Sequence, residues 1–105
     1  MAETAALPLA EHVLAILRAN EAELRAAGIR HLSLFGSVAR GDAKAGSDVD
    51  LVVVLDHEAR IDLFRLTGLE QRLGELLGRR VDLVPEPVEK SRLQAHIDRD
   101  RRNAF

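Results

Sequence analysis

The chain has 105 residues, of which 47% are apolar and 30% are charged, a composition typical of a globular domain. Fifteen lysines and arginines against 17 acidic residues give a net charge of −2, and only three residues are aromatic. These values argue against a broadly basic or base-stacking surface, so we expect no nucleic-acid partner. The lack of cysteine excludes disulfides and thiolate metal sites, and no apolar run is long enough to span a membrane. We expect a single domain over residues 1–105 in the cytoplasm.

Residues 8–28 have the pattern of an amphipathic helix. Pro8 suits a helix start, and Gly28 stands where a left-handed C-cap would close the helix. Between them, apolar residues recur at helical spacing: Val13, Leu14, Leu17 and Leu24. The next residues, 29–35, are a short apolar-rich run that ends at a glycine, which predicts a strand.

Residues 36–46 are a turn-rich connector with three glycines, and one short helical turn over residues 38–40 fits inside it. The strongest strand signal follows at residues 48–55, Asp-Val-Asp-Leu-Val-Val-Val-Leu, which are rich in β-branched side chains.

The second half of the chain repeats the pattern of helix, strand and helix. Residues 61–77 carry leucines and a phenylalanine at helical intervals and are closed by Gly78. Residues 80–84 predict a third short strand, stopped by Pro85. Residues 88–102 predict a polar helix, and we expect residues 103–105 to fray.

This order of elements predicts an α/β (α+β) fold. The helix between the second and third strands favours a parallel crossover for that pair. The short connector between the first and second strands favours an antiparallel pair instead. We therefore expect a small three-stranded mixed sheet flanked by about four helices.

Acidic residues on two of these strands suggest a metal site. Side chains two apart in a strand share a face, so Asp48 and Asp50 point the same way. Asp82 occupies the corresponding face of the third strand, and three carboxylates converge if the two strands are neighbours. Carboxylates at such short distances repel one another, and a bound cation offsets this repulsion. Oxygen ligands with room for phosphate oxygens suit magnesium, and such sites serve phosphoryl or nucleotidyl transfer.

The Gly36-Ser37 pair after the first strand supplies groups that suit phosphate. Glycine lets the backbone approach a phosphate closely, and the Ser37 hydroxyl can bind phosphate oxygens at a helix N-terminus. Arg40 lies one helical turn further on and can neutralise phosphate charge.

Each feature also has a plain structural interpretation. Asp-x-Asp can be a turn and cap motif, and Asp82 can be the polar residue of an edge strand. Arg40 can form a surface ion pair with Asp42. Three C-terminal arginines are most simply a solvated helix end: Arg99, Arg101 and Arg102. The combination and the order of the features favour a nucleotide site.

Residues 35–41, Phe-Gly-Ser-Val-Ala-Arg-Gly, and residues 47–51, Ser-Asp-Val-Asp-Leu, resemble a family signature. This signature is the one of the minimal nucleotidyltransferases of the DNA polymerase beta superfamily. Residues 80–84 resemble the strand that carries the third acidic residue in that family. The resemblance implies a polymerase-beta-like core. It also implies metal-binding, catalytic roles for Asp48, Asp50 and Asp82, and nucleotide binding by Gly36, Ser37, Arg40 and Ser47.

The same resemblance implies an activity and a partner. Members of this family are often antitoxins that adenylylate helical HEPN-type toxins. We therefore expect a Mg²⁺-dependent transfer of AMP from ATP to a hydroxyl of a HEPN-type partner protein. A non-catalytic antitoxin that acts by contact, or a transferase for a small-molecule acceptor, remains an alternative. The sequence leaves open the acceptor, the base preference, the oligomeric state and whether the domain is active alone.

Overall fold

A four-stranded mixed sheet lies at the centre of the structure, a computed structural model that describes residues 8–59 and 62–105. Its strands are β1 (Ile29–Phe35), β2 (Val49–Leu55), β3 (Val81–Pro85) and β4 (Arg102–Asn103), in the order β3-β2-β1-β4. As the connectors predict, β1 and β2 are antiparallel, and β2 and β3 are parallel. The α+β class is therefore confirmed.

The fourth strand corrects the sequence prediction of three strands and a fraying C-terminus. β4 pairs with β1, where the Ser33 hydroxyl donates to the Asn103 side chain at 2.7 Å. Further along, the Ala104 N–H donates to the Leu32 carbonyl at 2.9 Å, and Ala104 is buried. A strand of two residues carries no periodicity that a sequence pattern could reveal.

The predicted first helix is broken into α1 (Leu9–Ala19) and α2 (Glu21–Ala26). The break is at Asn20, whose side-chain amide donates to the Ile16 carbonyl at 2.8 Å. Asparagine competes in this way with the hydrogen bonds of the helix backbone, so the chain can turn here. α2 ends at Ala26 with Ala27 as its C-cap, and Gly28, the next residue, has a φ of 107°.

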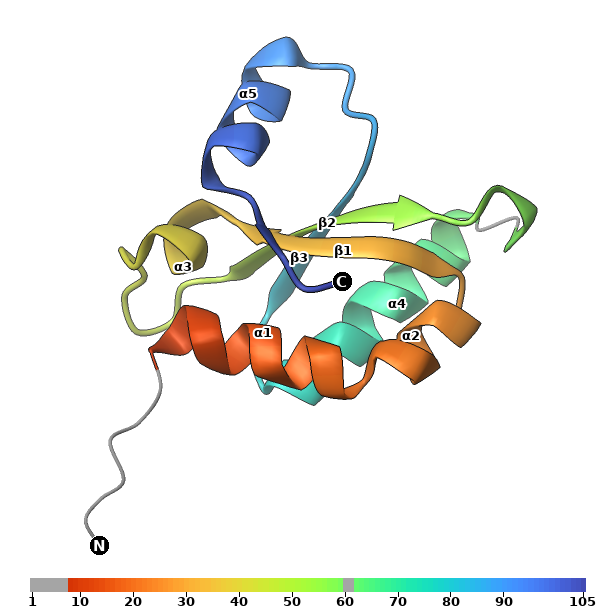
Figure 1. The fold of residues 1–105 in the computed structure, drawn as a ribbon, viewed down its shortest axis with the longest axis horizontal. Coiled ribbons are helices and arrows are strands. Elements are labelled where there is room, and N and C mark those ends of the chain that lie inside the picture. Colours follow the sequence, from red (N-terminus) through yellow and green to blue (C-terminus); the bar gives the residue numbers. More distant parts are fainter. Residues whose placement is uncertain (1–7, 60–61) are drawn as a thin grey trace, which may run out of the picture.

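Helices cover the two faces of the sheet unequally (Figure 1). α1, α2 and α4 (Leu63–Leu77) pack on one face, and α5 (Ser91–Asp100) alone crosses the other. The larger core lies on the first face and includes Leu17, Leu34, Leu51 and Leu73. The smaller core, under α5, is formed by Phe35, Val52 and Ile97.

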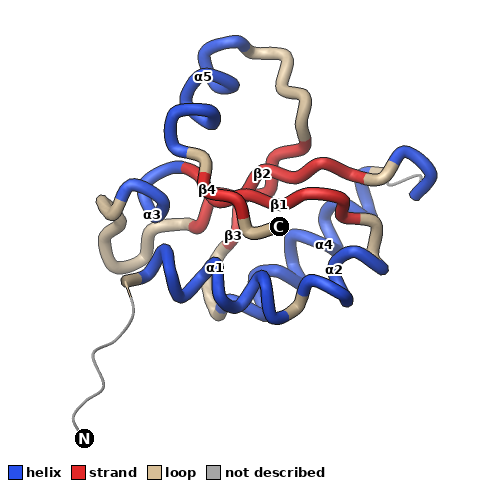
Figure 2. The backbone as a smooth tube through the Cα atoms, in the orientation of Figure 1, coloured by secondary structure: helices blue, strands red, loops and turns tan. Residues whose placement is uncertain are grey.

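Three helix boundaries differ from those predicted. The predicted start of the helix after β2, Ile61, lies outside the described residues. α4 begins after Asp62, and the Asp62 side chain caps the helix by accepting the Arg65 N–H at 2.9 Å. α5 is shorter than the predicted residues 88–102, and a 3₁₀ turn, η1 (His57–Ala59), follows β2. Figure 2 shows how loops separate these elements from the sheet. Within the described residues, no helix has the length and apolar character needed to cross a membrane.

Candidate active site

The parallel pairing of β2 with β3 sets two carboxylates side by side. In this register Asp50 is the partner of Asp82. Asp48 directly precedes β2, two residues from Asp50. The residues that alternate with them are buried in the larger core: Val49, Leu51, Val53, Val81 and Leu83. The pleat of two adjacent strands therefore directs the acidic residues to the opposite face, which is the face that α5 covers.

A sharp turn from β1 into α3 (Gly36–Arg40) meets the same carboxylates. Gly36 has a φ of 77°, in the left-handed region that favours glycine. A Cβ atom at this position would lie 2.3 Å from Oδ2 of Asp50. Glycine is thus required both by the backbone and by the close approach of Asp50, and the glycine-serine turn lies directly against the carboxylate.

Electrostatics link the acidic residues to one another. Burial raises the pKa of the Asp50 carboxyl above its usual value, and the negative charges of Asp82 and Asp48 raise it further. The positive charge of Arg40 acts on this pKa in the opposite direction. Asp50 is therefore the point at which three carboxylates and one guanidinium influence each other.

The chemistry of this donor set fits a divalent cation bound together with phosphate. Asp50 is half-buried, and Asp48 and Asp82 are exposed to solvent. Among residues 8–59 and 62–105, no three acidic, histidine or cysteine side chains form a ready-made metal cage. A cation would relieve the repulsion at Asp50, while phosphate oxygens and water would complete its coordination, as magnesium prefers. The metal-binding role of the three aspartates stays a prediction.

Two of the residues predicted to bind nucleotide, Ser37 and Ser47, form hydrogen bonds within the connector between β1 and β2. Ser37 is half-buried in the first turn of α3, and its carbonyl accepts the Asp42 N–H at 2.8 Å. The Ser47 hydroxyl accepts the Lys44 N–H at 2.9 Å and so closes the turn that leads into Asp48. This contact gives Ser47 a structural role, and its contact with a nucleotide stays a prediction.

Arg40 combines the two interpretations offered by its sequence. Its Nε donates to Asp42 Oδ2 at 2.9 Å, as the plain surface interpretation expects. Its Nη1 also donates to Asp100 Oδ2 at 2.7 Å, a contact across 60 residues of chain. The guanidinium therefore bridges the connector after α3 and the end of α5.

The interpretation as a solvated helix end holds only for Arg99, which lies in the last turn of α5 with 59% of its side chain exposed. It is wrong for Arg101 and Arg102, which lie beyond α5 and form ion pairs with other segments. Arg99 donates from Nε to Asp100 at 3.0 Å, and Arg102 forms an ion pair with Glu11 on α1. Arg101 donates to Glu86 at 3.0 Å, in the loop between β3 and α5. No local pattern reveals such partners, since Glu11 and Arg102 are 91 residues apart.

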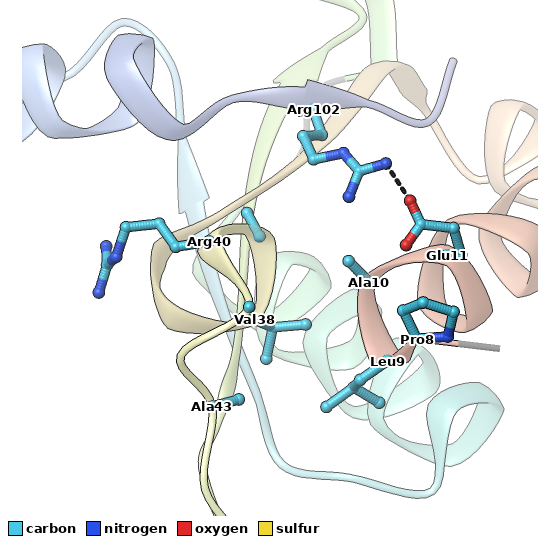
Figure 3. A pocket seen from close by; sticks show the side chains of 10 residues that line it. Pro8, Leu9, Ala10, Glu11, Val38, Arg40, Ala43 and Arg102 are labelled. Carbon is cyan, nitrogen blue, oxygen red and sulfur yellow. Dashed lines mark hydrogen bonds and ion pairs between the residues drawn. The ribbon is translucent and has the colours of Figure 1, made fainter. Parts of the chain in front are cut away.

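A pocket of about 400 Å³ lies between the start of α1 and α3. Figure 3 shows Val38 and Ala43 at this pocket, with the Arg40 side chain pointing away from it. The Glu11–Arg102 ion pair lies at its edge. Arg40 is among the residues that line this pocket, but none of the three aspartates lines it.

Comparison with known proteins agrees with this geometry. Residues 16–104 match the family described as nucleotidyltransferase domain. The chain belongs to this family. The predicted family membership is thus confirmed.

Individual relatives are similar to this nucleotidyltransferase domain over most of its length. Protein adenylyltransferase MntA of Thermococcus cleftensis is 42% identical over 91 residues, which cover 86% of this chain and 90% of the relative. The solved structure of a protein described as a minimal nucleotidyltransferase is 33% identical. It matches with a TM-score of 0.73 over 89% of this chain and 93% of that chain.

A third comparison shows the shared fold alone. A chain from the complex of tri-AMPylated Shewanella oneidensis HEPN toxin with MNT antitoxin is 20% identical to this domain. It matches with a TM-score of 0.63 and covers 88% of this chain and 71% of that chain.

Proposed function

We propose that this nucleotidyltransferase domain transfers AMP from ATP to a hydroxyl group of a partner protein, with magnesium, in the cytoplasm. The observation that carries the proposal is the pairing of Asp50 with Asp82, with Gly36 packed against Asp50 and Asp48 two residues away. This arrangement supports a triphosphate bound beside clustered carboxylates. The adenylyltransferase MntA, similar over 86% of the chain, supports AMP as the group transferred.

The proposed reaction is an in-line displacement at the α-phosphorus of ATP. The acceptor oxygen forms the new bond to phosphorus, the bond to the bridging oxygen of the β-phosphate breaks, and pyrophosphate leaves. Bound magnesium would supply charge neutralisation for the triphosphate and the leaving group. Asp48, Asp50 and Asp82 would hold it, and Asp82, which is exposed, would accept the proton of the attacking hydroxyl.

The backbone of the Gly36-Ser37 turn holds the triphosphate in this proposal. The first N–H groups of a helix have no partner within the helix, so those at the start of α3 would donate to phosphate oxygens, and Gly36 would leave room for the close approach of the phosphate. Arg40 adds a positive charge on the side of α5.

A protein acceptor is favoured by the known complex of similar fold. In that complex the toxin is of the HEPN type and carries AMP groups, and the antitoxin is an MNT protein. We propose a partner of the same helical HEPN class, with this chain as the antitoxin that modifies it. A side-chain hydroxyl of the partner, most simply that of tyrosine, would enter at the exposed side of Asp82.

The test is mass spectrometry of a HEPN-type protein that co-purifies with this chain, after incubation of the purified pair with ATP and magnesium. We expect the partner to gain mass in AMP units, and we expect Asp48→Asn to abolish the gain because metal-assisted transfer loses a ligand. Asp98→Asn is the matched control, since this exposed aspartate lies on α5, outside the carboxylate site, and should leave transfer intact.

Two other results would replace the proposal. A partner that binds tightly but gains no nucleotide from any of the four triphosphates would make this chain an antitoxin that acts by contact. Modification of small alcohols or aminoglycosides, with no modified protein, would make it a transferase for small molecules.

A further inference from the structure

Asp100, the last residue of α5, has a buried acidic side chain, and burial destabilises an unpaired charge. Only 4% of its side chain is exposed, and two arginines satisfy its oxygens. Arg99 and Arg40 both donate to it, and these hydrogen bonds, the one from Arg99 foremost, keep the pKa of the Asp100 carboxyl below its usual value. A buried carboxylate with this environment is anionic at neutral pH and in a single orientation.

Arg40 is the partner that connects Asp100 to the nucleotide site. It ends α3, the short helix that begins at Gly36 against Asp50. Its two ion pairs differ in their surroundings, because the Asp42 side chain is 64% exposed and that of Asp100 is 4% exposed. The buried contact is shielded from solvent and salt, so it restrains the guanidinium more strongly than the exposed one.

We infer that Asp100 is a positioning residue that holds the Arg40 guanidinium beside the triphosphate site. The inference deepens the proposed function and rests on it. A guanidinium has five N–H donors, so the contacts from Nε and Nη1 to the two aspartates leave donors for phosphate oxygens. An arginine restrained in this way loses little side-chain freedom when phosphate binds. α5 therefore contributes to nucleotide affinity through Asp100, although it lies outside the signature that binds phosphate.

The test is a double-mutant cycle on the dissociation constant of Mg–ATP, measured by calorimetry on the full chain. Arg40→Ala and Asp100→Asn should each weaken binding about tenfold, the size expected for one charge-assisted hydrogen bond. The double variant should bind no more weakly than Arg40→Ala, because Asp100 acts through Arg40. Asp42→Asn is the matched control, since it removes the exposed partner of the same arginine and should leave affinity unchanged.

A purely structural role of Asp100 predicts different results. It would give additive losses in the double variant, or an unchanged dissociation constant for Asp100→Asn, and either result overturns the inference. Tighter binding by Asp100→Asn also overturns it, because Asp100 would then withhold Arg40 from phosphate. Thermal unfolding of each variant checks the fold, and Asp100→Glu, which keeps the charge, should recover most of the affinity if Asp100→Asn unfolds.

The wild-type measurement separates this inference from the proposed function. A wild-type chain that binds no Mg–ATP would overturn the proposed function, together with the inference that rests on it. A wild-type chain that binds Mg–ATP only as tightly as Asp100→Asn does would overturn the positioning role alone.

Discussion

Gly36 lies directly against the Asp50 side chain, and their geometry shows why the turn residue is a glycine. The left-handed backbone at Gly36 already disfavours other residues. A second constraint is space, because a methyl carbon on residue 36 would lie 2.3 Å from Asp50 Oδ2, and carbon and oxygen atoms cannot approach so closely. Any side chain at residue 36 must displace the carboxylate that the proposed magnesium ion needs.

Gly36→Ala should therefore impair the site beyond its effect on stability. We expect a loss of stability of about 1–2 kcal/mol from the backbone conformation alone. We also expect loss of Mg–ATP binding, because Asp50 moves. Calorimetric titration with Mg–ATP and thermal unfolding measure the two effects separately.

Gly78→Ala is the matched control for this prediction. Gly78 also has a positive φ, 64°, but a methyl group there meets no atom within 4 Å, and it closes α4 rather than α3. This variant should lose stability in the same way and still bind Mg–ATP. Equal binding by the two alanine variants would show that Gly36 is needed for its backbone conformation only.

At the scale of elements, one carboxylate of the loop after β3 contacts both the first half of α5 and the residue that follows α5. Glu86, in the loop after β3, accepts hydrogen bonds from Arg101 at 3.0 Å and from Gln94 at 2.8 Å. The hydrogen bonds from Arg101, followed by that from Gln94, keep the pKa of the Glu86 carboxyl below its usual value of 4.5. The loop and the helix are thus held together by one anionic group.

The pH dependence of Glu86→Gln follows from the direction of this pKa change. The folded state binds the proton less readily than the unfolded state, so ionised Glu86 contributes stability above pH 4.5. That contribution is lost as the pH falls from there through the lower pKa of the folded state. At pH 7 we expect the variant to lose about 1 kcal/mol of unfolding free energy, and the difference from wild type should shrink toward pH 3, about 1.5 units below the usual pKa of 4.5. Urea unfolding across this pH range measures it.

Glu23→Gln provides the control for that measurement. Glu23 also pairs with an arginine, Arg72, but both side chains are nearly half exposed, at 47% and 46%. Solvent screens such a pair, so this variant should change stability little at any pH. A loss for Glu86→Gln that persisted unchanged at acid pH would contradict an electrostatic origin.

At the scale of the whole molecule, the two faces of the sheet are covered by cores of different size. Three helices pack on one face, whereas α5 meets the other through Ile97, which contacts Phe35 and Val52. Ile97 is fully buried, although most of its helix is polar and exposed. Attachment of α5, and with it the position of Asp100, thus depends chiefly on Ile97, with the half-buried Leu93 and the ion pairs.

Ile97→Ala should make local unfolding of α5 more frequent than unfolding of the rest of the domain. Truncation of a buried isoleucine costs about 2–5 kcal/mol, and here the lost contacts are confined to the smaller core. Hydrogen exchange should accelerate more in α5 than in α1. Leu73→Ala, which empties an equally buried position in the larger core, should instead accelerate exchange in the helices of the other face. Uniform acceleration by Ile97→Ala would show that α5 unfolds only with the whole domain.

The sequence by itself determined the features that depend on neighbouring residues. Side chains two apart in a strand share a face whatever the fold, so the common direction of Asp48 and Asp50 could be predicted. The glycine-serine turn and the strand that carries Asp82 were likewise recognisable from short segments. The parallel pairing of β2 with β3 could be predicted from the helix between them, since a helical crossover of that length favours parallel strands.

Only the tertiary structure decided which distant residues meet. The Arg40–Asp100 contact spans 60 residues, and the pairing of β4 with β1 joins Ser33 to Asn103, 70 residues apart. Arginine and aspartate occur many times in this chain, so their types alone do not select partners. Selection occurs when the sheet and helices bring two surfaces together and burial makes an unpaired charge costly. The faces of strands are thus a local property of the sequence, whereas the environment of Arg40 is a property of the folded chain.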